Sequence, residues 1–390
     1  MKTAKNQRAT NSFLEPATSC QQPVASSQQP AASSQKAAAS IRPFIIPIFL
    51  PHAGCPHQCV FCNQVSITGS IQKTINADQI KVQIHQFLEY KNNRRKPVQI
   101  SFYGGNFLGL KPGEVQSLLE LATDFVKQGH ADSIRFSTRP DTITPQRLDF
   151  ISKYPVETIE LGVQSMDDQV LALARRGHSA ADTTRAVHQL KEYKFNIGLQ
   201  MMVGLPGDTE TLSLISAQKI AALQPDFVRI YPTIVVKNSL LARWYQDGAY
   251  VPLSLEEAVS RVTILYRYFT RHNIKIIRMG LQASADLADG STVLAGPYHP
   301  AFGHMVYSKI FLDAACTAIK AANSARPSVA IFVNPRRVST MRGLKNANVE
   351  LIKSRFGFDR ISIVPDNNIE ENSVKINNGN PTSCFVYLDN

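Results

Sequence analysis

Short apolar runs alternate with helical patterns between residues 43 and 280, and this rhythm limits the fold more than any other feature. The runs expected to form strands occupy residues 44–50, 98–103, 133–137, 156–161, 195–203 and 227–231, with a weaker seventh at 274–277. Between them, apolar residues recur three or four positions apart, as amphipathic helices require. Strands that alternate with helices build a parallel sheet with helices packed outside it. We therefore expect an α/β fold, a partial parallel (β/α)6-type barrel.

The rhythm stops on both sides, which divides the chain into three expected parts. Residues 1–42 are rich in Ala, Ser, Gln and Pro and should form a disordered low-complexity tail, because they bury too little apolar surface to offset ordering. Residues 43–280 form the barrel. Residues 281–390 should be a small α/β accessory region with helices near 308–323 and 347–356, strands near 329–333 and 361–364, and a polar, partly loose end after 366.

Composition excludes several classes of protein. The chain has 390 residues, 44% of them hydrophobic and 18% charged, enough for a packed core, and no apolar run is long enough to cross a membrane. Six cysteines, three of them in one cluster, do not form a disulfide framework, so we expect a reducing, cytoplasmic setting. The net charge is +12, which favours polyanionic partners. A basic run could contact RNA or be a solvated face: Arg336, Arg337, Arg342 and Lys345.

The cysteine cluster directly follows the first expected strand. Cys55, Cys59 and Cys62 have the spacing Cys-x3-Cys-x2-Cys. Clusters of the four-iron type normally take four cysteines, so three would leave one iron without a protein ligand. An open coordination position is typical of a catalytic metal centre, whereas closed shells are structural. The alternative from the residues alone is a zinc site completed by His52 or His57.

Further motifs follow the other expected strands, where barrels of this kind carry their functional groups. They are Tyr-Gly-Gly-Asn at 103–106, Ser-Thr-Arg-Pro-Asp at 137–141, Glu-Leu-Gly-Val-Gln-Ser at 160–165, Arg-Arg-Gly-His at 175–178 and Val-Gly-Leu-Pro-Gly-Asp-Thr at 203–209. Each of them alone could be a turn or a set of hydrogen-bonded lining residues. The ordered set favours a functional site.

The cysteine motif followed by these motifs in this order resembles the radical S-adenosylmethionine superfamily, and within it the branch of the Elongator catalytic subunit. The resemblance covers residues 43–280, and the region after it shows no recognisable acetyltransferase domain. The resemblance implies a [4Fe-4S] cluster on Cys55, Cys59 and Cys62, with S-adenosyl-L-methionine at the open iron. It also implies reductive cleavage to a 5′-deoxyadenosyl radical that abstracts hydrogen from a substrate, and an electron donor of the flavodoxin or ferredoxin type.

The resemblance further implies which side chains lie near S-adenosylmethionine. Phe61 would shield the cluster or contact adenine, and the two glycines after Tyr103 would let the backbone approach the ligand, because glycine has no Cβ. The full expected set is Phe61, Tyr103, Gly104, Gly105, Asn106, Thr138, Gln164, Arg176 and Gln200. In the related coproporphyrinogen-oxidase branch the positions of Thr138 and Gln200 tend to be acidic, so this chain departs from that pattern.

The substrate is less constrained than the reaction class. RNA, in particular tRNA, is the first expectation, from the Elongator-like motifs and the basic charge. A small molecule, as in the coproporphyrinogen-oxidase-like branch, is the second. A non-catalytic metal-binding module that interacts with RNA is the alternative from a different class.

Overall fold

The structure is a computed structural model that describes residues 19–20, 43–50, 54–63, 76–91, 97–281, 292–322, 327–377 and 384–387. The chain separates into two compact units. One is Gln29–Val306, and the other is Tyr307–Asn390 together with strand β1 (Ser19–Cys20).

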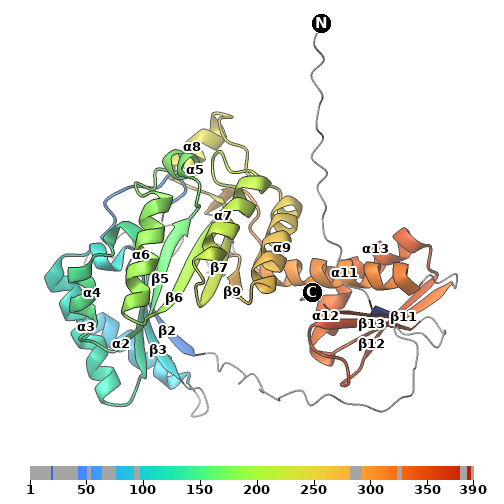
Figure 1. Ribbon diagram of the computed structural model, residues 1–390, viewed down its shortest axis with the longest axis horizontal. Helices are drawn as coiled ribbons and strands as arrows, with labels where there is room; N and C mark the ends of the chain where they lie inside the picture. The colour runs from blue at the N-terminus through green and yellow to red at the C-terminus, as the bar shows by residue number, and fades with distance from the viewer. Residues whose placement is uncertain are drawn as a thin grey trace, which may run out of the picture. The chain divides into compact units, whose positions relative to one another are not determined.

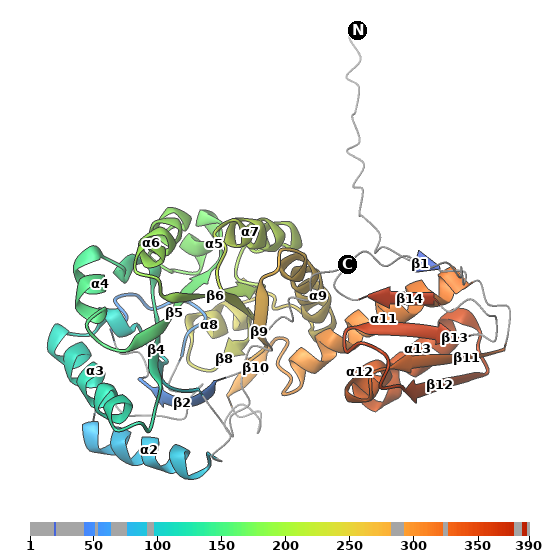
Figure 2. The same ribbon diagram turned by 60° about the horizontal axis from the view of Figure 1, so that its bottom comes forward.

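The first unit is built on a parallel sheet whose strands follow chain order. Its strands are β2 (Phe44–Phe49), β3 (Val98–Tyr103), β4 (Ser133–Thr138), β5 (Val156–Gln164), β6 (Asn196–Val203), β7 (Phe227–Pro232) and β9 (Lys275–Met279). Strands β2 and β9 are its two edges, so the sheet is an open, partial barrel (Figure 2). The expected fold class is confirmed, and the seventh strand is present.

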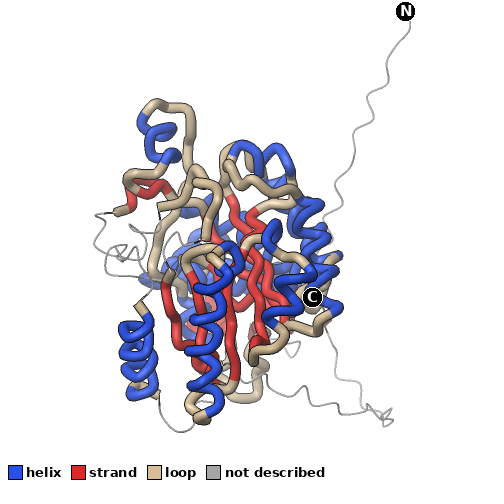
Figure 3. The backbone as a smooth tube through the Cα atoms, turned by 90° about the vertical axis from the view of Figure 1, so that its left-hand side faces the viewer, coloured by secondary structure: helices blue, strands red, loops and turns tan. Residues whose placement is uncertain are grey.

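Helices cover the outer face of this sheet (Figures 1 and 3). They are α2 (Ala77–Glu89), α3 (Pro112–Lys127), α4 (Pro145–Ile151), α5 (Asp168–Leu173), α6 (Ala180–Glu192), α7 (Glu210–Ala222) and α9 (Leu255–Arg271). Their starts follow ordinary capping chemistry: Thr144, the expected cap, accepts a hydrogen bond from the Arg147 N–H, and Ser254 forms a capping box with Glu257.

Side-chain alternation along the strands separates an apolar outer face from a polar inner face. On β4, Ile134 and Phe136 are completely buried on the helix-covered side, while Arg135 between them points the other way. The same alternation on the neighbouring strands gives the inner face Ser101, Glu160, Gln200 and Arg229. The outer face packs against the helices and supplies the apolar core of this unit. The polar inner face can therefore bind a polar ligand.

Three short elements complete the first unit at the carboxyl end of the sheet. Strands β8 (Val235–Val236) and β10 (Val293–Ala295) pair antiparallel, and α8 (Leu240–Gln246) follows β8. Two 3-10 turns, η1 (Phe107–Gly109) and η2 (Pro140–Thr142), follow β3 and β4. These turns directly follow the expected site residues Asn106 and Thr138.

The second unit contains a five-stranded mixed sheet of order β1-β14-β13-β11-β12. Strands β11 (Ser328–Val333) and β12 (Arg360–Pro365) are parallel, and β13 (Ser373–Asn377) and β14 (Cys384–Tyr387) add antiparallel. Its helical elements are the latter part of α11 (Phe302–Ala322), η3 (Pro335–Arg337), α12 (Val338–Arg342), η4 (Leu344–Asn346) and α13 (Ala347–Phe356).

Three details differ from expectation in this part of the chain. The end after residue 366, expected to be polar and partly loose, contains two strands, β13 and β14, that pair within the sheet, and Val374 on β13 is fully buried. Helix α11 begins at Phe302, before the expected 308, and the two residues of β1 pair with β14 although they lie in the segment expected to be disordered.

Among the described residues no helix is long and apolar enough to span a bilayer.

Candidate functional site

The cysteine loop follows β2 and is anchored to neighbouring segments at three points. The Val60 N–H donates to the Ala174 carbonyl (3.2 Å), the Leu241 N–H donates to the Val60 carbonyl (2.8 Å), and the Asn63 side-chain amide donates to the Lys237 carbonyl (2.8 Å). Cys59 is buried, while Cys55 and Cys62 are half-buried. The loop is therefore held at the carboxyl end of the sheet, with two of its three cysteines partly exposed.

The cysteine loop also touches the turn after β3 through backbone atoms. Gly54 has φ +70°, and a Cβ there would lie 2.2 Å from the Asn106 carbonyl oxygen; a Cβ at Gly109 would lie 2.2 Å from the Gly54 carbonyl oxygen. Both positions therefore require glycine. The sequence predicted close approach at Gly104 and Gly105 instead, and Gly54–Gly109 was missed because each glycine looks ordinary without its distant partner.

Asn106 joins three loops and is completely buried. Its Nδ2 donates to the Gly54 carbonyl (2.9 Å), and its Oδ1 accepts from the Thr138 hydroxyl (2.7 Å), the Arg139 N–H (3.1 Å) and the Thr142 hydroxyl (3.1 Å). The Thr138 hydroxyl also accepts from the Leu108 N–H. Asn106 and Thr138 were predicted to contact the cofactor. In the structure their side-chain hydrogen bonds join the loops after β2, β3 and β4 to one another.

Arg176 reaches the cysteine loop directly. Its Nη1 donates to Cys59 Sγ (3.1 Å) and its Nη2 to the Gly162 carbonyl (2.6 Å), and the whole residue is buried. Arg139, which pairs with Asp141 at 2.9 Å, also donates to the Arg176 carbonyl. Arg176, expected near S-adenosylmethionine, thus contacts one of the three cysteines directly. Arg139 is a supporting residue that the sequence placed only in a turn.

Gln164 and Gln200 meet on the inner face beside Gly162. Gln164 has φ +67° at the irregular end of β5, and the Gln200 Nε2 donates to its Oε1 (3.4 Å). A left-handed backbone costs a non-glycine residue roughly 1–2 kcal/mol, and such strain is concentrated at functional sites. A Cβ at Gly162 would lie 3.1 Å from Gln164 Nε2 and 3.3 Å from Arg176 Nη2, so this glycine leaves room between them.

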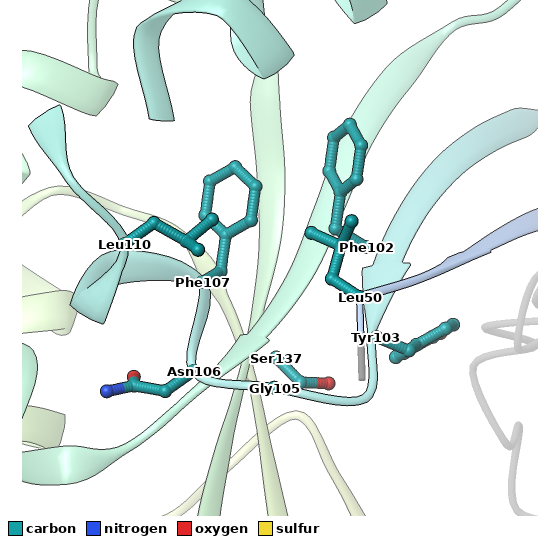
Figure 4. A pocket seen from close by; sticks show the side chains of 8 residues that line it. All are labelled: Leu50, Phe102, Tyr103, Gly105, Asn106, Phe107, Leu110 and Ser137. Carbon is teal, nitrogen blue, oxygen red and sulfur yellow. The ribbon is translucent and has the colours of Figure 1, made fainter. Parts of the chain in front are cut away.

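Phe61 and Tyr103 make different contacts. Phe61 is half-buried against an apolar cluster that includes Val60, Leu205 and Leu241. Tyr103 ends β3, and its hydroxyl accepts from Arg229 Nη2 (3.2 Å). Figure 4 shows Tyr103 pointing away from the stacked Phe102 and Phe107 rings. The small pocket in this view is lined by Leu50, Phe102, Tyr103, Gly105, Asn106, Phe107, Leu110 and Ser137.

Burial and neighbouring cations set the protonation of the site. Burial raises the pKa of the Cys55 thiol and the adjacent Cys59 raises it further, whereas the Arg139 and Arg176 guanidinium groups lower it. Burial, reinforced by Arg176 and Arg139, lowers the pKa of His178 to about 4. His178 is therefore neutral at pH 7, and its Nε2 lies 3.3 Å from the Val163 carbonyl oxygen.

The donor set suits an iron–sulfur cluster better than a single ion. Among the described residues, no three His, Cys, Asp or Glu side chains meet closely enough to hold one metal ion. A cluster takes each thiolate on a different iron, so its ligands need not meet at one point, and cationic Arg176, which donates to Cys59 Sγ, places a positive charge beside the expected anionic ligands. The His57 ring packs on Gly177, where a Cβ would lie 2.3 Å from it, and His52 lies outside the described residues.

Comparison with known sequences gives two family matches. Residues 49–211 match the Radical SAM superfamily, and residues 225–311 match the Radical SAM C-terminal domain. Together these regions contain the cysteine loop and the carboxyl ends of all seven strands of the parallel sheet.

Individual relatives are distant. An uncharacterized protein of Methanocaldococcus jannaschii is 27% identical over 56% of this chain and 70% of its own length. The tRNA uridine(34) acetyltransferase of Dehalococcoides mccartyi is 24% identical over 51% of this chain, which spans only 50% of that relative's length. The solved structure of the archaeal Methanocaldococcus infernus Elp3 aligns with a TM-score of 0.55 at 16% identity, covering 85% of this chain and 73% of that one, which shows a shared fold.

Proposed function

Since the chain belongs to the radical S-adenosylmethionine (SAM) superfamily of enzymes, we propose that Cys55, Cys59 and Cys62 hold a [4Fe-4S] cluster beside a SAM site. The observation that carries this proposal is the contact of the buried Arg176 with Cys59 at the carboxyl end of the parallel sheet. When both groups are bound, the cluster supplies the electron for reductive cleavage of a carbon–sulfur bond in SAM.

The remaining residues of the site orient the ligand and exclude water. We assign direct contacts with SAM to side chains and glycines that border the cysteine loop and the inner face: Phe61, Tyr103, Gly104, Gly105, Gln164, Arg176 and Gln200. Asn106 and Thr138 act as positioning residues, because their hydrogen bonds hold the cysteine loop against the loops after β3 and β4.

An anaerobic preparation tests the cluster. The wild-type chain should contain about four irons and four sulfides and should release 5′-deoxyadenosine from SAM with dithionite or a flavodoxin-type donor. Cys55→Ala, Cys59→Ala and Cys62→Ala should each abolish that release. Cys316→Ala is the matched control, because Cys316 is a buried thiol on α11 outside the site. Stoichiometric zinc without sulfide would reject the proposal and leave a non-catalytic metal-binding module.

RNA is the substrate class that we propose first. It is supported by the basic charge of the chain and by the tRNA-directed name of one relative, although this chain spans only half of that relative. Part of the expected RNA surface is neutralised, because Glu371 pairs with Arg337 at 3.0 Å and with Arg336 at 3.7 Å. Stimulation of 5′-deoxyadenosine release by tRNA would support RNA, and stimulation by small anionic metabolites alone would favour a small molecule instead.

A further inference from the structure

A network of buried charges lies on the inner face of the sheet. Arg135 Nε donates to Glu160 Oε1 at 2.6 Å, and Arg229 Nε lies 2.7 Å from Glu160 Oε2. The side chains of Arg135 and Glu160 are only 6% and 4% exposed. One carboxylate therefore serves two guanidinium groups in a region with little water.

A third arginine adds to this imbalance. Arg278 on β9 is paired with Arg229 just after a register irregularity that skips Ile277, and paired residues project to the same face of the sheet. Within the described part of the chain, Arg278 has no ion-pair partner and Arg135 Nη2 has no hydrogen-bond partner. Buried charges are normally balanced, because an uncompensated one is costly. On this face the described residues therefore place three guanidinium groups, of which that of Arg278 is only half-buried, around the Glu160 carboxylate.

The excess charge can be reached from the side of the SAM site. Arg229 is the most accessible member of the buried network, with 15% of its side chain exposed. Its Nη groups donate to the Tyr103 and Tyr231 hydroxyls at 3.2 Å, and its strand neighbour is Gln200, one of the residues assigned to SAM. The Arg135 guanidinium stacks on the Phe227 ring. This ring needs a glycine at position 198, because a Cβ on Gly198 would lie 2.2 Å from it.

We propose that Arg229 and Arg278, with the Tyr103 and Tyr231 hydroxyls, bind an oxyanionic group of the substrate, a phosphate or a carboxylate. Guanidinium groups match the planar, multi-oxygen geometry of these anions and remain charged when buried. Arg135 and Glu160 are positioning residues, because Glu160 holds both buried guanidinium groups in place. The anion site itself is inferred from the arginines. That the anion belongs to the substrate of a radical enzyme rests on the proposed function.

Calorimetric titration of the reconstituted full chain with inorganic phosphate, uridine 5′-monophosphate and succinate tests the site. Uridine serves as the uncharged comparison. Phosphate or succinate should bind, and Arg278→Gln should weaken binding about tenfold through the loss of a charge-assisted contact. Arg229→Gln should weaken it at least as much. Arg185→Gln, which removes the same charge from an exposed side chain on α6, should leave binding unchanged.

The outcomes separate the ligand sources and the two proposals. Tighter binding of uridine 5′-monophosphate than of succinate assigns a phosphate, and the reverse assigns a carboxylate. Equal binding by Arg278→Gln and Arg185→Gln, or displacement of the anion by SAM, overturns the assignment to substrate. Because binding is read without catalysis, anion binding by a chain that fails to cleave SAM rejects only the proposed function. SAM cleavage without anion binding rejects only this site.

Discussion

His178 shows how burial at the single-residue scale sets a pH dependence. Its folded pKa is about 4, whereas an exposed histidine titrates near 6.5. Between these values the unfolded chain binds a proton that the folded chain excludes, so the free energy of unfolding falls as pH falls through this window. The full difference corresponds to about 3 kcal/mol, all of it available at pH 7 and lost toward pH 4.

We predict that His178→Gln flattens this part of the pH profile, because a neutral amide can keep a hydrogen bond to the Val163 carbonyl but cannot titrate. Urea unfolding of the chelator-treated chain at pH 7.5 and pH 5 measures the effect, which should be roughly 2 kcal/mol less pH-dependent than in the wild type. His130→Gln is the control, because His130 is exposed. An unchanged profile in His178→Gln would show that the buried ring is not the titrating group.

At the scale of elements, the contact between the cysteine loop and η1 determines where the thiols lie. Gly54→Ala should destabilise the chain by about 2–5 kcal/mol, combining left-handed strain with a clash against backbone atoms. Iron bound after anaerobic reconstitution should fall with it. Gly129→Ala is matched in φ (+74°) but has open space around its Cβ, so it should cost only the strain. Equal thermal shifts in the two variants would show that the loop contact is not tight.

The elements themselves were largely predictable, whereas the contacts between them were not. Each strand of the barrel has its own apolar pattern, so β3 was predicted to the residue. The helix expected near 347–356 coincides with α13 in the second unit, and Thr144 was predicted as a cap from local chemistry. The order of motifs predicted the cysteines and Arg176 as site residues, and the structure brings Arg176 into contact with Cys59. The roles of Gly54 and Asn106 depend on distant partners, and the charge excess around Arg229 depends on strand register, which no local pattern encodes.

At the scale of the whole molecule, the positive charge is unevenly available to a polyanion. In the basic run of the second unit, Arg336 and Arg337 share Glu371, and Arg337 also stacks over the Tyr307 ring at 5.4 Å. Arg342 and Lys345 are exposed. If this run contacts RNA, Arg342 and Lys345 should contribute most of the electrostatic attraction. The charges of Arg336 and Arg337 attract phosphate less, because the Glu371 carboxylate partly neutralises them.

We therefore predict opposite effects from two sets of substitutions on binding of total tRNA. Arg342→Gln with Lys345→Gln should reduce the salt dependence of the binding constant by about two phosphate contacts, since each lost contact lowers the logarithmic slope by about one. Glu371→Gln should steepen it, because Arg336 and Arg337 become available. Filter binding between 50 and 200 mM salt, a range in which about 6–10 contacts would change affinity strongly, measures both. Lys127→Gln with Lys153→Gln in the first unit is the charge-matched control, and identical slopes in all variants would exclude the run as the RNA contact.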